Sequence, residues 1–122
     1  MVDVLIVDDD ELIREMLLEI MRVAGIKAVA TEDGTNAMKI VKDENVRLVI
    51  TDLIMPGKEG LETIISLKKE TPQVKIIAIS GGGRISPESY LGIARDIGAQ
   101  YTFTKPFDRK KLLGAVRDCL QG

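Results

Sequence analysis

Acidic side chains follow two apolar runs of this chain, with a serine and a lysine after two others. Asp8–Asp10 follow the first run, Asp52 ends another, and Ser80 and Lys105 come directly after later ones. Carboxylate oxygens are the ligands that Mg²⁺ prefers, and the ion usually keeps several waters. A carboxylate beside such an ion can attack a phosphoryl group, while a lysine and a hydroxyl stabilise its oxygens. Brought together, these residues are suited to metal-assisted phosphoryl transfer.

The elements that must position these residues alternate along the chain. Short apolar, β-branched runs predict strands at Val4–Val7, Lys27–Ala30, Leu48–Thr51, Lys75–Ile79 and Tyr101–Thr104. Apolar residues at helical spacing predict helices over residues 11–24, 35–42, 59–70, 86–97 and 108–120. Three of the runs are continuous, which is typical of strands covered on both faces. The pattern favours one α/β domain over residues 1–122, with a parallel sheet and right-handed crossovers.

The candidate residues all fall at carboxyl ends of predicted strands. Ligands of doubly wound sheets bind beyond these ends, where the strand order reverses. Periodicity alone leaves the strand order open. Carboxylates gathered at such a mouth need a cation or a shared proton, because their charges repel one another. We therefore expect a single site at this edge of the sheet.

Composition excludes several other classes of site. The chain has 122 residues, no histidine and one cysteine, Cys119, so a histidine-based zinc site, a Ser-His-Asp triad and an internal disulfide are excluded. A net charge of −2 and an aromatic share of 3% disfavour a nucleic-acid partner. No apolar run approaches the ~20 residues of a membrane span, and the N-terminus lacks a signal-peptide pattern. We expect a soluble, cytoplasmic protein with no membrane contact.

Taken singly, several of these residues have ordinary structural interpretations. Asp10 suits a helix N-cap better than a metal ligand, and Cys119 lies in an apolar helical stripe and suits core packing. The glycines at 81–83 favour a flexible turn over a phosphate-binding loop, and no GxxxxGK[ST] motif is present. Only the combination of residues indicates a phosphoryl-transfer site.

That combination resembles the receiver domains of two-component response regulators. The matching motifs are Val4–Asp10, Thr51–Gly57, Ile79-Ser80, Gly98-Ala99 and Lys105–Phe107. The resemblance implies a flavodoxin-like fold, a doubly wound parallel sheet of five strands in the order 2-1-3-4-5.

The resemblance also assigns the metal and phosphoryl residues. It implies that Asp52 is the phosphorylated aspartate and that Asp8 and Asp9 surround Mg²⁺, with Asp9 a direct ligand. The main-chain carbonyl of Ile54 matches the third protein ligand. Mn²⁺ is an alternative ion for the same site.

Two further residues match the family, and one position departs from it. Ser80 matches the hydroxyl residue that turns toward the phosphoryl group. Lys105 matches the family's lysine, whose bond to the following Pro106 is typically cis. Many receivers carry an aromatic switch residue three positions before the lysine, where this chain has Thr102. Strand alternation places Tyr101 and Phe103 on the opposite face, so an aromatic switch is not expected here.

The implied function is a signalling switch that catalyses only its own phosphorylation and dephosphorylation. The phosphodonor would be a sensor histidine kinase or phosphotransfer protein, and an unknown protein target would bind the face formed by the fourth helix, fifth strand and last helix. The start at Met1 favours a stand-alone regulator over an excised receiver.

Three alternatives remain open at this point. A haloacid-dehalogenase-like phosphohydrolase would use Asp8 as nucleophile, since Asp8-Asp9-Asp10 satisfies its Asp-x-Asp spacing, but Leu12 replaces the expected Thr or Val. A non-phosphorylated pseudo-receiver would be an interaction module only, and such domains usually lack an acidic residue or the lysine. A flavodoxin-like cofactor protein would need a phosphate-binding loop and flanking aromatic residues.

Overall fold

Five parallel strands form one sheet in the order β2-β1-β3-β4-β5. The computed structural model describes residues 2–53, 60–81 and 87–121, with the backbone alone for residues 87–91. The strands are β1 (Val4–Val7), β2 (Ala28–Thr31), β3 (Leu48–Asp52), β4 (Lys75–Ser80) and β5 (Tyr101–Thr104). The strand order implied by the resemblance is confirmed. The weakest predicted strand, at 27–30, lies one residue further along the chain.

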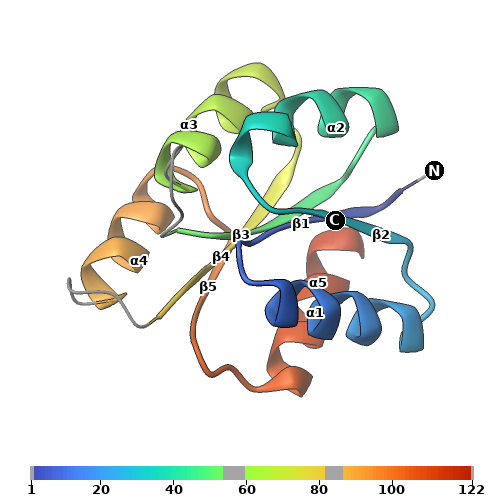
Figure 1. Cartoon of the computed structure of the whole chain (residues 1–122). Helices are drawn as coiled ribbons and strands as arrows, with labels where there is room; N and C mark the ends of the chain where they lie inside the picture. The colour runs from blue at the N-terminus through green and yellow to red at the C-terminus, as the bar shows by residue number, and fades with distance from the viewer. Residues whose placement is uncertain (1, 54–59, 82–86, 122) are drawn as a thin grey trace.

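Helices cover both faces of this sheet. They are α1 (Glu11–Val23), the 3₁₀ helix η1 (Gly34–Asn36), α2 (Ala37–Glu44), α3 (Gly60–Glu70), α4 (Pro87–Asp96) and α5 (Arg109–Gln121). Figure 1 shows α1 and α5 on one face and α2, α3 and α4 on the other. The predicted helix over 35–42 is corrected: its first turn is the 3₁₀ helix, and α2 continues to Glu44. No helix in the described ranges is both long and apolar enough to span a membrane.

Local chemistry explains where α1 begins and where α1 and α2 end. The Asp10 carboxylate accepts the Leu12 N–H at 2.9 Å and caps α1, which confirms the cap interpretation. Gly25, with φ +76°, follows the end of α1 in the left-handed region that glycine adopts without strain. Asn45 takes φ 55° and ends α2 in the same way.

The sheet separates two apolar layers, and alternate residues of the inner strands enter each. Val4 and Ile6 of β1 pack with α1 and α5, while Leu5 and Val7 pack with α2, α3 and α4. All four side chains are fully buried. This two-sided burial is the physical reason why the inner strands read as continuous apolar runs.

The strand register brings the polar strand ends to one edge of the sheet. Val7 is aligned with Thr51, so the residues that follow them, Asp8 and Asp52, lie side by side. On the other side of β3, Asp52 is aligned with Ile79 of β4. Since β1 leads out to β2 on one side and β3 leads to β4 on the other, this edge is where the strand order reverses.

Candidate functional site

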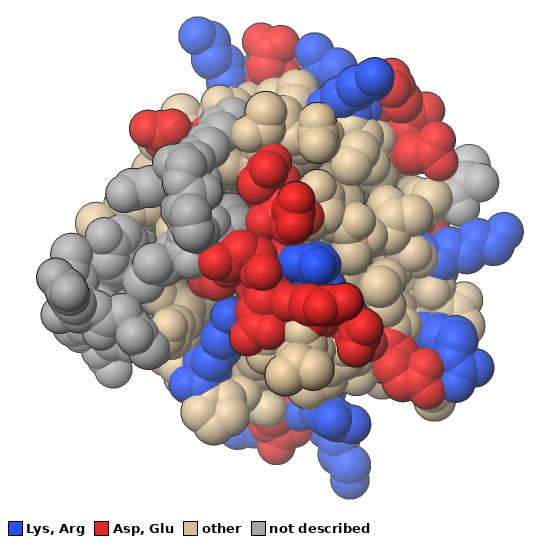
Figure 2. Space-filling view, viewed as in Figure 1, with Lys and Arg blue, Asp and Glu red and all other residues tan. Residues whose placement is uncertain are grey.

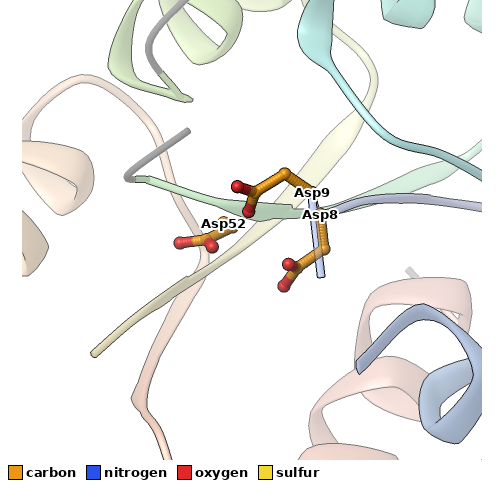
Figure 3. A group of neighbouring side chains, drawn as sticks. All are labelled: Asp8, Asp9 and Asp52. Atoms are coloured by element: carbon orange, nitrogen blue, oxygen red, sulfur yellow. The ribbon is translucent and has the colours of Figure 1, made fainter. Parts of the chain in front are cut away.

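Three carboxylates converge at the carboxyl ends of β1 and β3. Asp8, Asp9 and Asp52 each offer an oxygen that lies within 4.8 Å of the others, and Figure 3 shows their side chains gathered around one point. Asp8 and Asp52 are buried, with 1% and 6% of their surface exposed, whereas Asp9 is exposed to solvent. Figure 2 shows acidic side chains crowded over the middle of this face. The three acidic side chains therefore meet at this edge of the sheet, one of them exposed and two buried.

Lys105 lies between two of these carboxylates. Its Nζ is 3.0 Å from Asp8 Oδ2 and 3.1 Å from Asp52 Oδ2. Burial disfavours the ammonium form, but the charges and hydrogen bonds of Asp52 and Asp8 outweigh it, so the pKa of Lys105 is raised above its ordinary value. The lysine thus stays charged and holds the two buried carboxylates together.

Strand alternation explains why these three side chains meet. Asp52 shares the face of Ile50, Asp8 shares that of Ile6, and Lys105 shares that of Phe103, which is the α1 and α5 side of the sheet. The bond between Lys105 and Pro106 is cis, as the resemblance implies. The Lys105 N–H donates to the Ser80 carbonyl at 2.8 Å, which ties the end of β5 to the end of β4.

Asp8 is held by its own turn as well as by Lys105. Its Oδ1 accepts the Asp10 N–H at 2.9 Å, and its main-chain carbonyl accepts a hydrogen bond from Arg14 Nη1 at 2.9 Å. Burial raises the pKa of Asp8, against the lowering effect of the bonds from Asp10 and Lys105, and the charge of Asp52 raises it further. A cation added here would relieve this crowding of negative charge.

Ser80 lies at the same edge without a partner among the described residues. It is fully buried, and its Oγ makes no hydrogen bond there. Alternation along β4 places its side chain opposite to that of Ile79, away from the layer that Asp52 and Lys105 share. An unpaired buried hydroxyl costs about 1–3 kcal/mol, so Ser80 is a donor without an acceptor.

Two glycines allow this close packing, and sequence reasoning missed their role. A Cβ on Gly81 would lie 2.7 Å from Lys105 Cβ, and one on Gly60 would lie 2.2 Å from the Asp52 carbonyl oxygen. Both positions therefore need glycine for close approach to site residues rather than for a turn. Gly81 directly follows a predicted strand end, a signal that flexibility explained equally well, whereas Gly60 is the first residue of α3 and carried no such signal.

Both aromatic residues of β5, which flank Thr102, face away from α4. Tyr101 and Phe103 pack into the layer of α1 and α5, and the Tyr101 hydroxyl donates a hydrogen bond to Asp118. Thr102 is half-buried beside Ala78 on β4. The expected alternation is confirmed.

The predicted carbonyl ligand of Ile54 and the glycines at 82 and 83 lie outside the described residues.

The residues present fit Mg²⁺ or Mn²⁺. The donors are all oxygens, and two or three carboxylates leave room for the waters that Mg²⁺ retains. One oxygen of Asp8 and one of Asp52 already contact Lys105. A cation bound through either of these oxygens would compete with the ammonium group for it.

Comparison with known proteins agrees with this geometry. The chain is 30% identical over 117 residues to sporulation initiation phosphotransferase F of Bacillus subtilis, covering 96% of this chain and 92% of that protein. It is 29% identical to the transcriptional regulatory protein CpxR of Escherichia coli, covering 97% of this chain but 49% of CpxR, and so spans about half the length of such relatives. The structure matches the receiver domain of NtrX from Brucella abortus with a TM-score of 0.90, 28% identity and 98% of both chains covered.

The family model for the response regulator receiver domain matches residues 4–117. This range contains all five strands of the sheet and every candidate site residue. The chain therefore belongs to the response regulator receiver domain family.

Proposed function

We propose that Asp52 accepts a phosphoryl group from a phosphohistidine of a sensor histidine kinase or phosphotransfer protein. The observation that carries this proposal is the grouping of Asp52 with Asp8, Asp9 and Lys105 at the switch in strand order. Asp8, Asp9, Asp52 and the Ile54 carbonyl would hold Mg²⁺ or Mn²⁺. We treat residues 1–122 as one receiver domain that acts in the cytoplasm.

In the transfer step, an Asp52 oxygen attacks the phosphorus atom. The P–N bond to the histidine breaks, and the imidazole leaves with the bonding electron pair and takes up a proton from solvent. When bound, the metal ion offsets negative charge on the phosphoryl oxygens. Lys105 would move its ammonium group from the carboxylates to a phosphoryl oxygen. The unpaired Ser80 hydroxyl would have to turn toward the site, where it would donate a hydrogen bond to another phosphoryl oxygen. Hydrolysis of the acyl phosphate by water restores Asp52.

This assignment is favoured over the alternative nucleophile. Asp8 is 1% exposed, one of its oxygens accepts the Asp10 N–H, and the other contacts Lys105. An aspartate committed in this way is poorly placed to attack a substrate from solvent, which disfavours a phosphohydrolase that uses Asp8. The presence of all three carboxylates and the lysine disfavours a pseudo-receiver. The only catalysis proposed is of the domain's own phosphorylation and dephosphorylation.

We propose that the phosphorylated state is read at the face of α4, β5 and α5 by a downstream protein. Phosphorylation adds charge within reach of Ser80 and Lys105. The Lys105 N–H already bonds to the Ser80 carbonyl, so movement of Ser80 toward the phosphoryl group would pull on the ends of both strands. With Thr102 in place of an aromatic residue, the change would pass mainly through the segment after β4 and into α4. The transcriptional role of relatives such as CpxR concerns longer proteins.

The test of the phosphoacceptor is labelling with acetyl phosphate and Mg²⁺, followed by intact mass and site mapping. Wild-type protein should gain one phosphoryl group on Asp52, and Asp52→Asn should gain none. Asp10→Asn is the matched control, because asparagine also caps helices and Asp10 is not a proposed ligand. It should be labelled normally. Labelling of Asp8, or labelling that survives in Asp52→Asn, would overturn the assignment.

A further inference from the structure

Arg14 of α1 reaches back to the turn that carries the acidic pair. Its Nη1 donates to the Asp8 main-chain carbonyl at 2.9 Å, across six residues of sequence. The side chain is half-buried, whereas Arg22 on the same helix is exposed and pairs with Glu19 at 2.7 Å. Arg14 touches none of the carboxylate oxygens of the site in any described contact. Arg14 therefore contacts the backbone of a proposed ligand residue rather than its carboxylate.

The Asp8 carbonyl is where the regular backbone pairing of β1 stops. The Asp8 N–H still donates to Thr31 of β2 at 3.2 Å, but the carbonyl of the same residue bonds to Arg14 instead of a neighbouring strand. That carbonyl belongs to the peptide group that joins Asp8 to Asp9. Since this peptide group is planar, holding its oxygen also fixes the direction in which the Asp9 residue leaves the strand.

Asp9 depends on this restraint more than Asp8 does. Asp8 is also held through its carboxylate, by the Asp10 N–H and by Lys105. The Asp9 side chain is exposed and makes no hydrogen bond or ion pair within the described part of the chain. Among the described residues, only its backbone therefore fixes where the Asp9 carboxylate lies.

We propose that Arg14 is a positioning residue that holds the turn at Asp8–Asp10, so that Asp9 is presented to the cation beside Asp52. This inference rests on the proposed function, because it concerns the same metal site. Arginine stays charged at all working pH values, and a charged donor makes a stronger hydrogen bond than a neutral one. Unlike Lys105, Arg14 need not move when a cation binds, since it occupies no carboxylate oxygen.

The direction in which Mg²⁺ affinity changes when Arg14 is replaced distinguishes a positioning role from a purely electrostatic one. As a nearby positive charge, Arg14 repels a cation, so its removal would tighten Mg²⁺ binding if charge were its only role. As a positioning residue, its removal would weaken binding, because the ligands would have to be ordered when the ion arrives. The two roles predict opposite changes in the dissociation constant.

The experiment titrates purified, unphosphorylated protein with MgCl₂ by calorimetry, and measures amide hydrogen exchange without metal. Arg14→Met should raise the Mg²⁺ dissociation constant about tenfold, the scale of one lost charge-assisted hydrogen bond. It should also speed exchange of the Asp10 N–H, which bonds to Asp8 Oδ1. Arg14→Lys keeps the charge and one donor and should recover most of the affinity. Arg22→Met, at an exposed arginine of the same helix, should match wild type.

The outcomes are distinguishable from those of the proposed function. Unchanged or tighter Mg²⁺ binding in Arg14→Met, or unchanged exchange at Asp10, overturns the positioning role. Failure of the wild-type protein to bind Mg²⁺ overturns the metal site of the proposed function, while the exchange measurement still decides whether Arg14 holds the turn. If Arg14→Met does not fold, Arg14→Gln, which keeps a neutral donor, replaces it in both measurements.

Discussion

Replacing Lys105 with methionine removes the only described cation in contact with the buried carboxylates. Oxygens of Asp8 and Asp52 lie within 4.8 Å of each other. At an effective dielectric constant of about 20, unit charges at that separation repel by about 3.5 kcal/mol. The Lys105 side chain is 21% exposed, so water already screens part of this interaction. We therefore expect the free energy of unfolding to fall by about 2–3 kcal/mol in the absence of metal.

Mg²⁺ should reverse most of this loss. If the ion uses the carboxylate oxygens that the Lys105 ammonium group contacts at 3.0 and 3.1 Å, it has to displace that group in the wild-type protein. No such displacement is needed in Lys105→Met, so we expect the Mg²⁺ dissociation constant to fall about tenfold. The phosphoryl-transfer rate should fall in the same variant, because the lysine also stabilises phosphoryl oxygens.

The assay is urea unfolding followed by far-UV circular dichroism, with and without saturating MgCl₂. Lys111→Met is the control, because Lys111 is an exposed lysine of α5 that forms no ion pair in the described residues. It should unfold like wild type under both conditions. An equal loss of stability for Lys105→Met with and without Mg²⁺ would refute the idea that lysine and metal share the same oxygens.

Three further predictions concern other parts of the site. Burial raises the pKa of Asp8, so ionisation of this carboxyl opposes folding, and Asp8→Asn should be more stable than wild type at neutral pH without metal. This advantage should shrink as the pH falls through the raised pKa of the folded state toward the unfolded value of 3.8. A difference in melting temperature that stays constant with pH would contradict the prediction. Gly81→Ala should lose about 1–3 kcal/mol in urea unfolding because its Cβ would lie 2.7 Å from Lys105 Cβ, whereas Gly92→Ala, with nothing described within 4 Å, should lose none. Leu12 is 75% exposed at the start of α1, where it would contact a docked histidine kinase. Leu12→Glu should therefore slow phosphoryl transfer from the kinase but leave labelling by acetyl phosphate unchanged. Equal slowing of both reactions would mean that Leu12 affects the chemistry rather than docking.

The sequence by itself determined which residues end the strands and which faces are buried. Continuous apolar runs predicted inner strands such as β1 and β4, and their residues, Lys75 apart, are buried on both sides of the sheet. Asp10 was recognisable as a cap because capping is a contact between near neighbours in the chain. Such local patterns report burial and helix ends, which depend on periodicity over a few residues. They also placed every candidate side chain at one edge of a parallel sheet.

Only the tertiary structure decided which of these side chains touch and how. That Lys105 contacts Asp8 as well as Asp52 depends on the register of β1, β3 and β5, which are far apart in the sequence. The close approach at Gly81 and the bond from Arg14 to the Asp8 carbonyl likewise depend on distances between backbones. Periodicity describes each residue's own environment, whereas these contacts belong to pairs of residues. Pairs at one sheet edge are set by which strands lie side by side, and the residue pattern of a single strand does not identify its neighbours.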